Sequence, residues 1–277
     1  MIFRKRTIPD EEIMTLKEQR SMLGDQLNFA AAEAYKLLRA NLTFSLPDEQ
    51  KCRVVGVTSA VRGEGKSTTS INLAYTLAET GKRVLLVEAD MRRPQLAHRL
   101  AIDAAPGLSN LLAGLCREKD VVQDVGLLEN MKVITSGDVP PNPSELLGSE
   151  RMSTVVETLA QSFDFIIFDL PPVNAVSDGL VVSRFIQGMI VVVRQDYSDR
   201  QGLSAALRQL EYMHIKVLGF VMTHSSISGG RYGRYGRFGR YGRYGQYGRY
   251  ESESRETGAD QERARKTGSA KSRKSKR

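Results

Sequence analysis

The sequence predicts a doubly wound α/β fold, with a mostly parallel sheet and helices on both faces, followed by a disordered C-terminal tail. Two observations support the fold: short apolar runs alternate with helical patterns, and the first run ends in a glycine-rich turn that opens a helix. A sharp change in composition near residue 229 predicts the tail.

Six runs are almost continuous in apolar residues, as expected of strands buried on both faces of a sheet. These runs are Arg53–Thr58, Arg83–Glu88, Met131–Thr135, Phe165–Asp169, Met189–Arg194 and Val217–Met222. Helical patterns separate them, for example over Ser67–Thr80 and Ser198–Met213. Such alternation is typical of a parallel sheet, and ligands of such sheets bind beyond the carboxyl ends of the strands.

Composition divides the chain into four regions. Residues 1–50 are polar, with a helix expected over Leu27–Phe44, and residues 51–228 form the α/β domain. Residues 229–250 are a three-residue repeat of glycine, arginine and tyrosine, and residues 251–277 are a basic, low-complexity tail. The last two regions are expected to be disordered, because they cannot bury enough apolar surface to offset the entropy of ordering.

The distribution of charge and cysteine excludes several classes of protein. The chain from Arg231 onward has 15 Lys and Arg against 5 Asp and Glu, so it carries +10, while residues 1–230 carry −2. A nucleic-acid-binding fold would spread basic charge over its own surface, so this role is not expected. With two cysteines, no signal peptide and no run of about 18–20 apolar residues, a cytoplasmic protein is expected.

The glycine-rich turn, Ala60–Thr68, has the pattern of a P-loop except that alanine holds the first glycine position. In a P-loop, backbone N–H groups and the positive end of a helix bind phosphate oxygens. The lysine reaches the β- and γ-phosphates and the following hydroxyl binds Mg²⁺. The turn therefore predicts a P-loop NTPase domain that binds ATP and Mg²⁺ through Gly63, Glu64, Gly65, Lys66, Ser67 and Thr68.

Two acidic residues follow apolar strands and are candidate metal ligands. Asp90 lies just past the second run and Asp169 ends the fourth. A carboxylate in such a place is often only a helix cap. Because parallel strands bring their carboxyl ends to one edge, we expect both residues beside the P-loop, with Ser67, Asp90 and Asp169 organising Mg²⁺.

These motifs together resemble the bacterial tyrosine kinases of capsular and exopolysaccharide assembly. The segments VTSAVRGEGKSTTSINLA, LLVEADMRRP and FIIFDLPPV are similar to the Walker A segment, the second acidic motif D-x-D-x-R and the Walker B strand of that family. PPNPSELL is a further family-like string, and EAYKLLRAN is similar to the oligomerisation motif E-x-x-R-x-x-R-x-N. The sequence departs from the family at Glu88 (usually Asp), Lys36 (usually Arg) and Thr223 (often Asn).

The resemblance implies an ATP-dependent autokinase that phosphorylates its own C-terminal tyrosines. Lys66, Asp90 and Asp169 would be catalytic, with Glu88 or Asp90 as the base that accepts the tyrosine proton. Arg92 would help neutralise phosphate, or would lie in a solvated loop. The implied phosphate acceptors are Tyr232, Tyr235, Tyr241, Tyr244, Tyr247 and Tyr250. Six phosphotyrosines would add about −9 to −12 and cancel or reverse the charge of the tail.

The resemblance also implies partners. A homo-oligomer, expected to be a ring, would use Glu33, Lys36, Arg39 and Asn41, with Glu33 and Arg39 exposed on one helix. The alternative for this helix is packing on its own domain. A separate transmembrane polysaccharide co-polymerase would activate the kinase and recruit it to the inner face of the membrane, and a protein-tyrosine phosphatase would reverse the modification.

Three other functions remain open at the level of sequence. An ATPase switch of the septum- or chromosome-positioning type would share the P-loop, but that group has a lysine where this chain has Val61. Glutamate at position 88, where the family usually has aspartate, would also be compatible with a nucleotide-responsive scaffold that has lost catalysis. The Arg-Tyr-Gly repeats would suit RNA, because arginine and aromatic side chains stack on bases.

Overall fold

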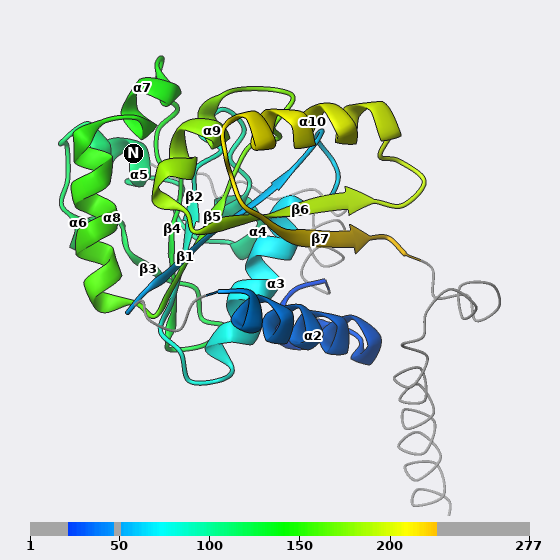
Figure 1. Ribbon diagram of the computed structural model, residues 1–277. Helices are drawn as coiled ribbons and strands as arrows, with labels where there is room; N and C mark the ends of the chain where they lie inside the picture. Colours follow the sequence, from blue (N-terminus) through cyan, green and yellow to red (C-terminus); the bar gives the residue numbers. More distant parts are fainter. Residues whose placement is uncertain (1–21, 47–50, 226–277) are drawn as a thin grey trace, which may run out of the picture. The chain divides into compact units, whose positions relative to one another are not determined.

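The computed structural model describes residues 22–46 and 51–225, which form one α/β domain (Figure 1). Its seven-stranded sheet has the order β3-β4-β2-β5-β1-β6-β7. The strands are β1 (Arg53–Ser59), β2 (Val84–Glu88), β3 (Gln123–Asp124), β4 (Met131–Ile134), β5 (Phe165–Asp169), β6 (Gly188–Arg194) and β7 (Val217–Thr223). All neighbours pair in parallel except β3 and β4, so the predicted doubly wound fold is confirmed.

The longer helices begin where the sequence supplies a cap or a suitable turn. Asn28, Ser149 and Asp199 each accept a backbone hydrogen bond in the first turn of the helix that follows. The described helices are α2 (Phe29–Ser45), α3 (Lys66–Ala78), α4 (Leu96–Leu100), α5 (Leu108–Leu112), α6 (Glu118–Val121), α7 (Pro143–Leu147), α8 (Glu150–Ser162), α9 (Asp178–Val182) and α10 (Arg200–Tyr212), with 3₁₀ turns η1 (Gly24–Gln26) and η2 (Ser183–Phe185).

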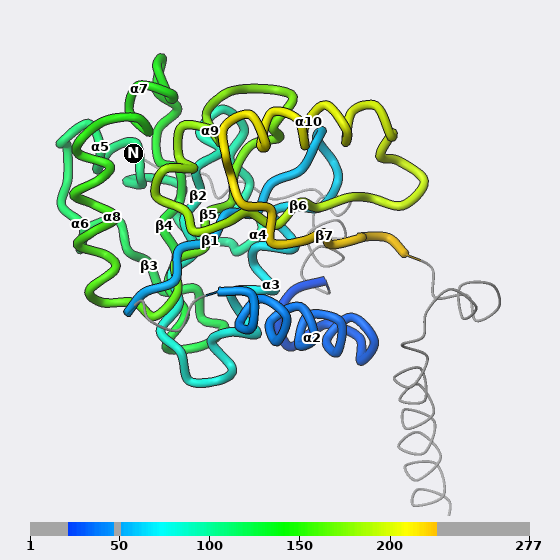
Figure 2. Tube along the Cα trace, viewed as in Figure 1, coloured from blue at the N-terminus to red at the C-terminus, as the bar shows by residue number. Residues whose placement is uncertain are grey.

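Successive strand residues belong to two different hydrophobic cores, as alternation along a strand requires. Val55, Leu86 and Ile167 pack with α2, α3 and α4 on one face of the sheet. Their chain neighbours on the other face, Val54, Leu85 and Ile166, pack with α5, α8 and α10. The tube in Figure 2 shows α2 and α3 on the opposite side of the sheet from α9 and α10.

The six predicted strands are confirmed to within one residue at each end. The seventh, β3, was not predicted, because two residues at an antiparallel edge give no periodic pattern. None of the described helices is long and apolar enough to cross a membrane. The predictions for residues 226–277, including all six acceptor tyrosines, lie outside the described residues, as do residues 1–21 and 47–50.

The prediction that Glu33 and Arg39 are both exposed is wrong for Arg39. Glu33 is exposed and bonds Lys36. Arg39 is half-buried, because its Nη1 donates to the carbonyl oxygen of Thr76 at 2.6 Å and lies 3.9 Å from Glu79 Oε2. Helix α2 therefore packs on α3 of its own domain through this arginine as well as through Leu42.

Replacement of Leu42 by alanine tests this packing. Leu42 is 3% exposed, whereas Leu37 on the same helix is 62% exposed. We expect Leu42→Ala to lower the free energy of unfolding by about 2–4 kcal/mol, because it leaves a cavity. Leu37→Ala should change it by less than about 0.5 kcal/mol. Urea denaturation measures both, and equal effects would show that α2 is not docked.

Candidate active site

The predicted phosphate-binding and acidic residues meet at one edge of the sheet. Strand β5 lies between β1 and β2, and Asp169 at its end is in register with Val57 of β1 and Glu88 of β2. The P-loop follows β1 and leads into α3, whose first residue is Lys66. The parallel topology thus brings residues far apart in sequence to a common rim.

Lys66 joins the two acidic motifs. Its Nζ lies 3.0 Å from Asp90 Oδ2 and 3.9 Å from Asp169 Oδ1, and all three side chains are nearly buried. Burial opposes the charge of Lys66, but Asp169 and Asp90 outweigh it and raise the lysine pKa. Burial raises the pKa of Asp169, against the lowering effect of Lys66 and of the Ser67 and Ser70 hydroxyls. The lysine is therefore charged, as phosphate binding requires.

The residues predicted to hold Mg²⁺ fit that ion. Asp169 Oδ2 is buried and has no hydrogen-bond partner in the described part of the chain, while Ser70 donates to Oδ1 of the same carboxylate at 3.2 Å. Ser67 and Asp90 are also nearly buried at this rim. Among the described residues no cluster of three His, Cys, Asp or Glu is placed to bind a metal unaided. Two carboxylates and a hydroxyl suit Mg²⁺, which takes one or two carboxylates and completes its shell with water and phosphate.

The P-loop turn needs glycine at two positions. Gly63 and Gly65 have φ of +79° and +96°, a region that favours glycine. A Cβ on Gly65 would lie 3.2 Å from the methyl carbon of Thr223, and one on Gly63 would lie 3.2 Å from the hydroxyl of Tyr197. The turn is therefore closely covered by residues from β7 and from the β6–α10 connection.

The covering residues also bond the P-loop. Thr223 Oγ1 donates to the carbonyl oxygen of Glu64 at 2.7 Å, and Arg194 Nη1 donates to that of Gly63 at 3.1 Å. The Glu64 carboxylate is buried, accepting from Val61 N at 2.8 Å and from the Ser198 hydroxyl. Thr223, a departure from the family pattern, thus supports the P-loop. Sequence reasoning missed Arg194 and Ser198 because no motif marks them.

Glu88 and Asp90 have different surroundings. Glu88 is fully buried, and its carboxylate accepts backbone N–H groups of Gln95, Leu96 (2.7 Å) and Ser136 (3.1 Å). Burial raises the pKa of Glu88, and the same N–H groups oppose that rise. Asp90 lies against Lys66 and accepts from Arg93 N at 3.2 Å. The Glu88 carboxylate is thus hydrogen-bonded to the backbone, while the Asp90 carboxylate forms an ion pair with the P-loop lysine.

Arg92 is held by an acidic residue that the sequence did not single out. Its Nε and Nη2 donate to Asp178 at 2.7 and 3.2 Å, and the Asp178 side chain is fully buried. Ser144, in the PPNPSELL string, donates to the same carboxylate. Asp178 therefore joins the loop after β2 to α7 and α9, and Arg92 is neither a free loop residue nor directed at the P-loop.

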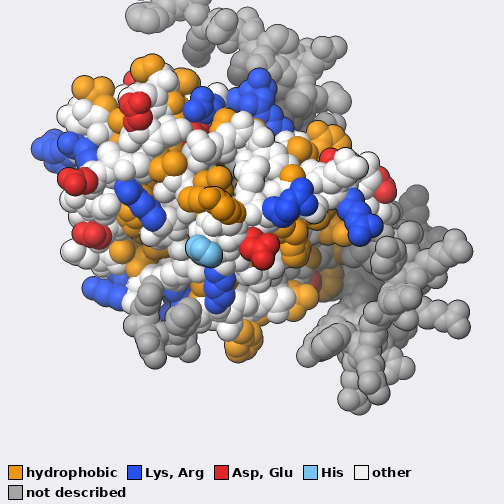
Figure 3. All heavy atoms as spheres, turned by 45° about the horizontal axis from the view of Figure 1, so that its top comes forward, with side chains coloured by type: hydrophobic (Ala, Val, Ile, Leu, Met, Phe, Trp, Pro, Cys, Tyr) orange, Lys and Arg blue, Asp and Glu red, His pale blue; other side chains and the backbone are white. Residues whose placement is uncertain are grey.

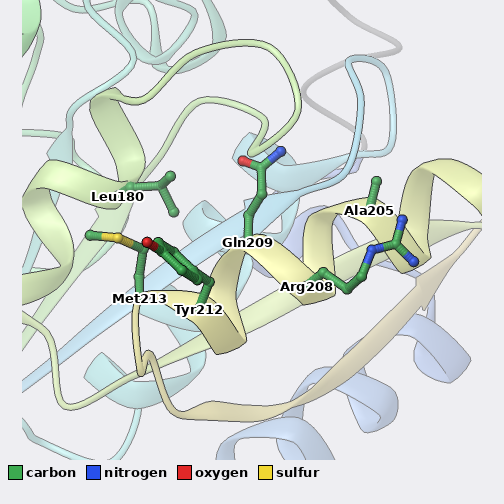
Figure 4. A pocket seen from close by; sticks show the side chains of 6 residues that line it. All are labelled: Leu180, Ala205, Arg208, Gln209, Tyr212 and Met213. Atoms are coloured by element: carbon green, nitrogen blue, oxygen red, sulfur yellow. The ribbon is translucent and has the colours of Figure 1, made fainter.

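A surface groove lies apart from this rim. It is lined by Leu180 of α9 and by Ala205, Arg208, Gln209, Tyr212 and Met213 from α10 onward (Figure 4). None of these residues belongs to the P-loop or the acidic motifs. On the face shown in Figure 3, basic side chains lie among hydrophobic and acidic ones rather than in one continuous basic surface.

The fold and this rim define a P-loop nucleotide-binding protein, and the comparisons give its family. A family model described as an AAA domain matches residues 52–218. The tyrosine-protein kinase YwqD of Bacillus subtilis is 34% identical over 71% of this chain and 82% of its own length. The putative tyrosine-protein kinase CapB of Staphylococcus aureus is 32% identical over 73% and 88%. This chain belongs to the bacterial tyrosine-protein kinase family.

Solved structures of related proteins agree with this family assignment. The chimerical protein CapA2B2 is 31% identical, with a TM-score of 0.69 over 74% of this chain and 89% of the other. The kinase domain of Escherichia coli tyrosine kinase ETK is 30% identical, with a TM-score of 0.68 over 81% and 85%. The septum site-determining protein MinD of Pyrococcus horikoshii, at 24% identity and a TM-score of 0.52, shows the fold alone.

Alanine at Arg92 tests its structural assignment. Arg92→Ala leaves the buried Asp178 carboxylate without its cation, so we expect the free energy of unfolding to fall by about 1–3 kcal/mol. A value in the lower half of that range is expected, because the Arg92 side chain is 42% exposed to solvent. Arg93→Ala, at the exposed next residue, should change it by less than about 0.5 kcal/mol. Urea denaturation compares them. If Arg92 instead bound phosphate, its loss would weaken nucleotide binding and leave stability unchanged.

Proposed function

We propose that this chain is an ATP-dependent protein-tyrosine autokinase that phosphorylates its own C-terminal tyrosine cluster. The observation that supports it most is the placement of Lys66 between Asp90 and Asp169 at the end of a P-loop. Membership of the tyrosine-kinase family and the row of tyrosines in residues 229–250 agree with it. Phosphoryl transfer needs mainly positioning and charge neutralisation, which this rim supplies.

Each residue has a role in this reaction. The triphosphate is bound by the N–H groups of Gly63, Glu64 and Gly65 and by Thr68. Lys66 neutralises its β- and γ-phosphates. Ser67, Asp90 and Asp169 would hold Mg²⁺, which when bound neutralises charge on the phosphates. The tyrosine oxygen bonds the γ-phosphorus while the bond from that phosphorus to the β–γ bridging oxygen breaks. ADP leaves, and the tyrosine proton passes to a carboxylate.

Asp90 is the better candidate for that carboxylate. A base must reach the proton that it removes. Glu88 is fully buried and accepts three backbone N–H groups, whereas Asp90 is 6% exposed and accepts one, from Arg93, beside its ion pair with Lys66. In this proposal Glu88 is a structural residue that fixes the loop carrying Asp90.

Substitution of the two carboxylates distinguishes them. We expect Asp90→Asn to lower the rate of tyrosine phosphorylation at least about 100-fold, the scale of a lost general base. Because it also removes one of the two charged partners of Lys66, thermal unfolding is measured in parallel to check that the variant is folded. Glu88→Asp, which keeps the charge and has the residue usual in the family, should retain activity within a few fold. Phosphotyrosine formation under saturating Mg²⁺–ATP measures both. Retained activity in Asp90→Asn would exclude Asp90 as the base.

The proposal includes transfer between subunits. Three residues on α2 are exposed and available to a neighbouring copy: Glu33, Lys36 and Asn41. The fourth, Arg39, instead bonds α3 of its own domain. A ring of such copies would place the tyrosine cluster of one chain at the P-loop of the next. Phosphorylation would cancel or reverse the positive charge of the tail and loosen this association.

Partners complete the proposed function. A separate transmembrane polysaccharide co-polymerase would stimulate the kinase and recruit it to the inner face of the membrane. This partner is what the resemblance to the kinases of capsular and exopolysaccharide assembly implies. Cycles of phosphorylation and removal by a tyrosine phosphatase would then regulate capsular or exopolysaccharide polymerisation and export.

Mixing the wild-type chain with a Lys66→Met chain of different mass tests kinase activity and transfer between chains together. We expect Mg²⁺–ATP to place phosphate on tail tyrosines of both chains in the mixture, and on none when Lys66→Met is incubated alone. Mass spectrometry of the tail peptides measures this. The control is phosphatase-treated protein without ATP.

Other outcomes would contradict parts of the proposal. Phosphate confined to the wild-type chain would mean transfer within one molecule. ATP hydrolysis with an unmodified tail, in the presence of the cytoplasmic segment of the membrane partner, would point to an ATPase switch. The likeness to MinD gives no support for that switch, because it extends only to the fold.

A further inference from the structure

We propose that Arg99 binds a non-transferred phosphate of the nucleotide, making it a second cationic nucleotide-binding residue beside Lys66. Arg99 lies outside the P-loop and outside both acidic motifs, so no pattern in the sequence marks it. This inference rests on the proposed function, since it assigns a further residue to the same nucleotide site.

Helix α4 holds Arg99 in a defined position. The Glu88 carboxylate accepts the N–H groups of Gln95 and Leu96, where α4 begins. Leu96 and Leu100, on either side of Arg99 in the helix, are buried in the core that α3 shares. Figure 1 shows α4 beside α3. The buried Glu88 thus fixes the element from which Arg99 projects.

Arg99 reaches the first turn of the P-loop helix. Its Nη1 donates to Thr68 Oγ1 at 3.2 Å, and Thr68 directly follows Ser67. Its Nε is buried and has no hydrogen-bond partner among the described residues. Within residues 22–46 and 51–225 no carboxylate lies within ion-pair distance of Arg99, whereas Arg83 and Arg92 each pair with an aspartate.

A guanidinium at this place, with no carboxylate partner among the described residues, is suited to phosphate. It has five N–H donors in a planar fork, of which one is bonded to Thr68. The rim has two carboxylates, Asp90 and Asp169, against the single cation Lys66, so a further cation would stabilise a polyphosphate there in addition to Mg²⁺. Guanidinium groups bind phosphate oxygens in pairs through charge-assisted hydrogen bonds.

The position along α3 indicates which phosphate is bound. Lys66 and Ser67 serve the β- and γ-phosphates and the metal between them, while the loop amides cradle the α- and β-phosphates. Arg99 approaches one residue further on, at Thr68. The contact therefore involves the α- or β-phosphate, which ATP and ADP share.

Nucleotide affinity of Arg99 variants tests the inference. We expect Arg99→Met to weaken binding of both Mg²⁺–ATP and Mg²⁺–ADP by about 10-fold or more, the scale of a charge-assisted hydrogen bond. Arg99→Lys, which keeps the charge and loses the fork, should give an intermediate loss. Isothermal titration calorimetry on the full chain measures these affinities.

Arg208→Met is the matched control. Arg208 is also helical and its guanidinium bonds a single hydroxyl, that of Ser204 at 3.0 Å, but it lines the groove on α10 (Figure 4). This variant should bind both nucleotides like the wild type. Thermal unfolding without nucleotide checks that the variants fold; if Arg99→Met does not, Arg99→Lys and Arg99→Gln carry the comparison.

The outcomes separate this inference from the proposed function. Equal losses for ATP and ADP support the assignment. Unchanged affinity in folded variants overturns it, and so does a loss for ATP alone, which would place Arg99 at the γ-phosphate. If the wild-type chain bound neither nucleotide, the proposed function itself would fail.

Discussion

The ion pairs of Lys66 with Asp90 and Asp169 are the interaction on which the functional part of this structure depends. They bring together the P-loop and both acidic motifs, which are found at the ends of three different strands. A lysine this deeply buried stays charged only with such partners. The order β2-β5-β1 in the sheet supplies them, since it aligns the ends of those strands at one edge.

Three further carboxylates and one arginine join this centre to the elements around it. Glu64 ties the P-loop to the β6–α10 connection, Glu88 caps α4, and Asp178 retains Arg92. Burial makes each carboxylate costly unless it is bonded, and each is bonded. Buried and bonded carboxylates therefore surround a site whose chemistry needs accurate placement of phosphate and metal.

The parts of the site that local sequence determines were predicted, and the parts that distant contacts determine were not. The glycine-rich turn with Lys66, and Asp90 and Asp169 at strand ends, follow from motif spacing and from the strand-end rule. In contrast, Arg92 meets Asp178 across 86 positions and Thr223 meets Glu64 across 159, which no pattern in one sequence reveals. Arg39 was misjudged for the same reason, since its partners are on α3.

The measurement that tests the central claim most directly is the effect of Mg²⁺ on ADP affinity in the wild type and in Asp169→Asn. The account predicts that Mg²⁺ strengthens ADP binding by the wild type, and that Asp169→Asn binds ADP with the same affinity whether Mg²⁺ or EDTA is present. An undiminished Mg²⁺ effect in folded Asp169→Asn would contradict it, because the metal would then be held without the carboxylate that Lys66 and Ser70 adjoin.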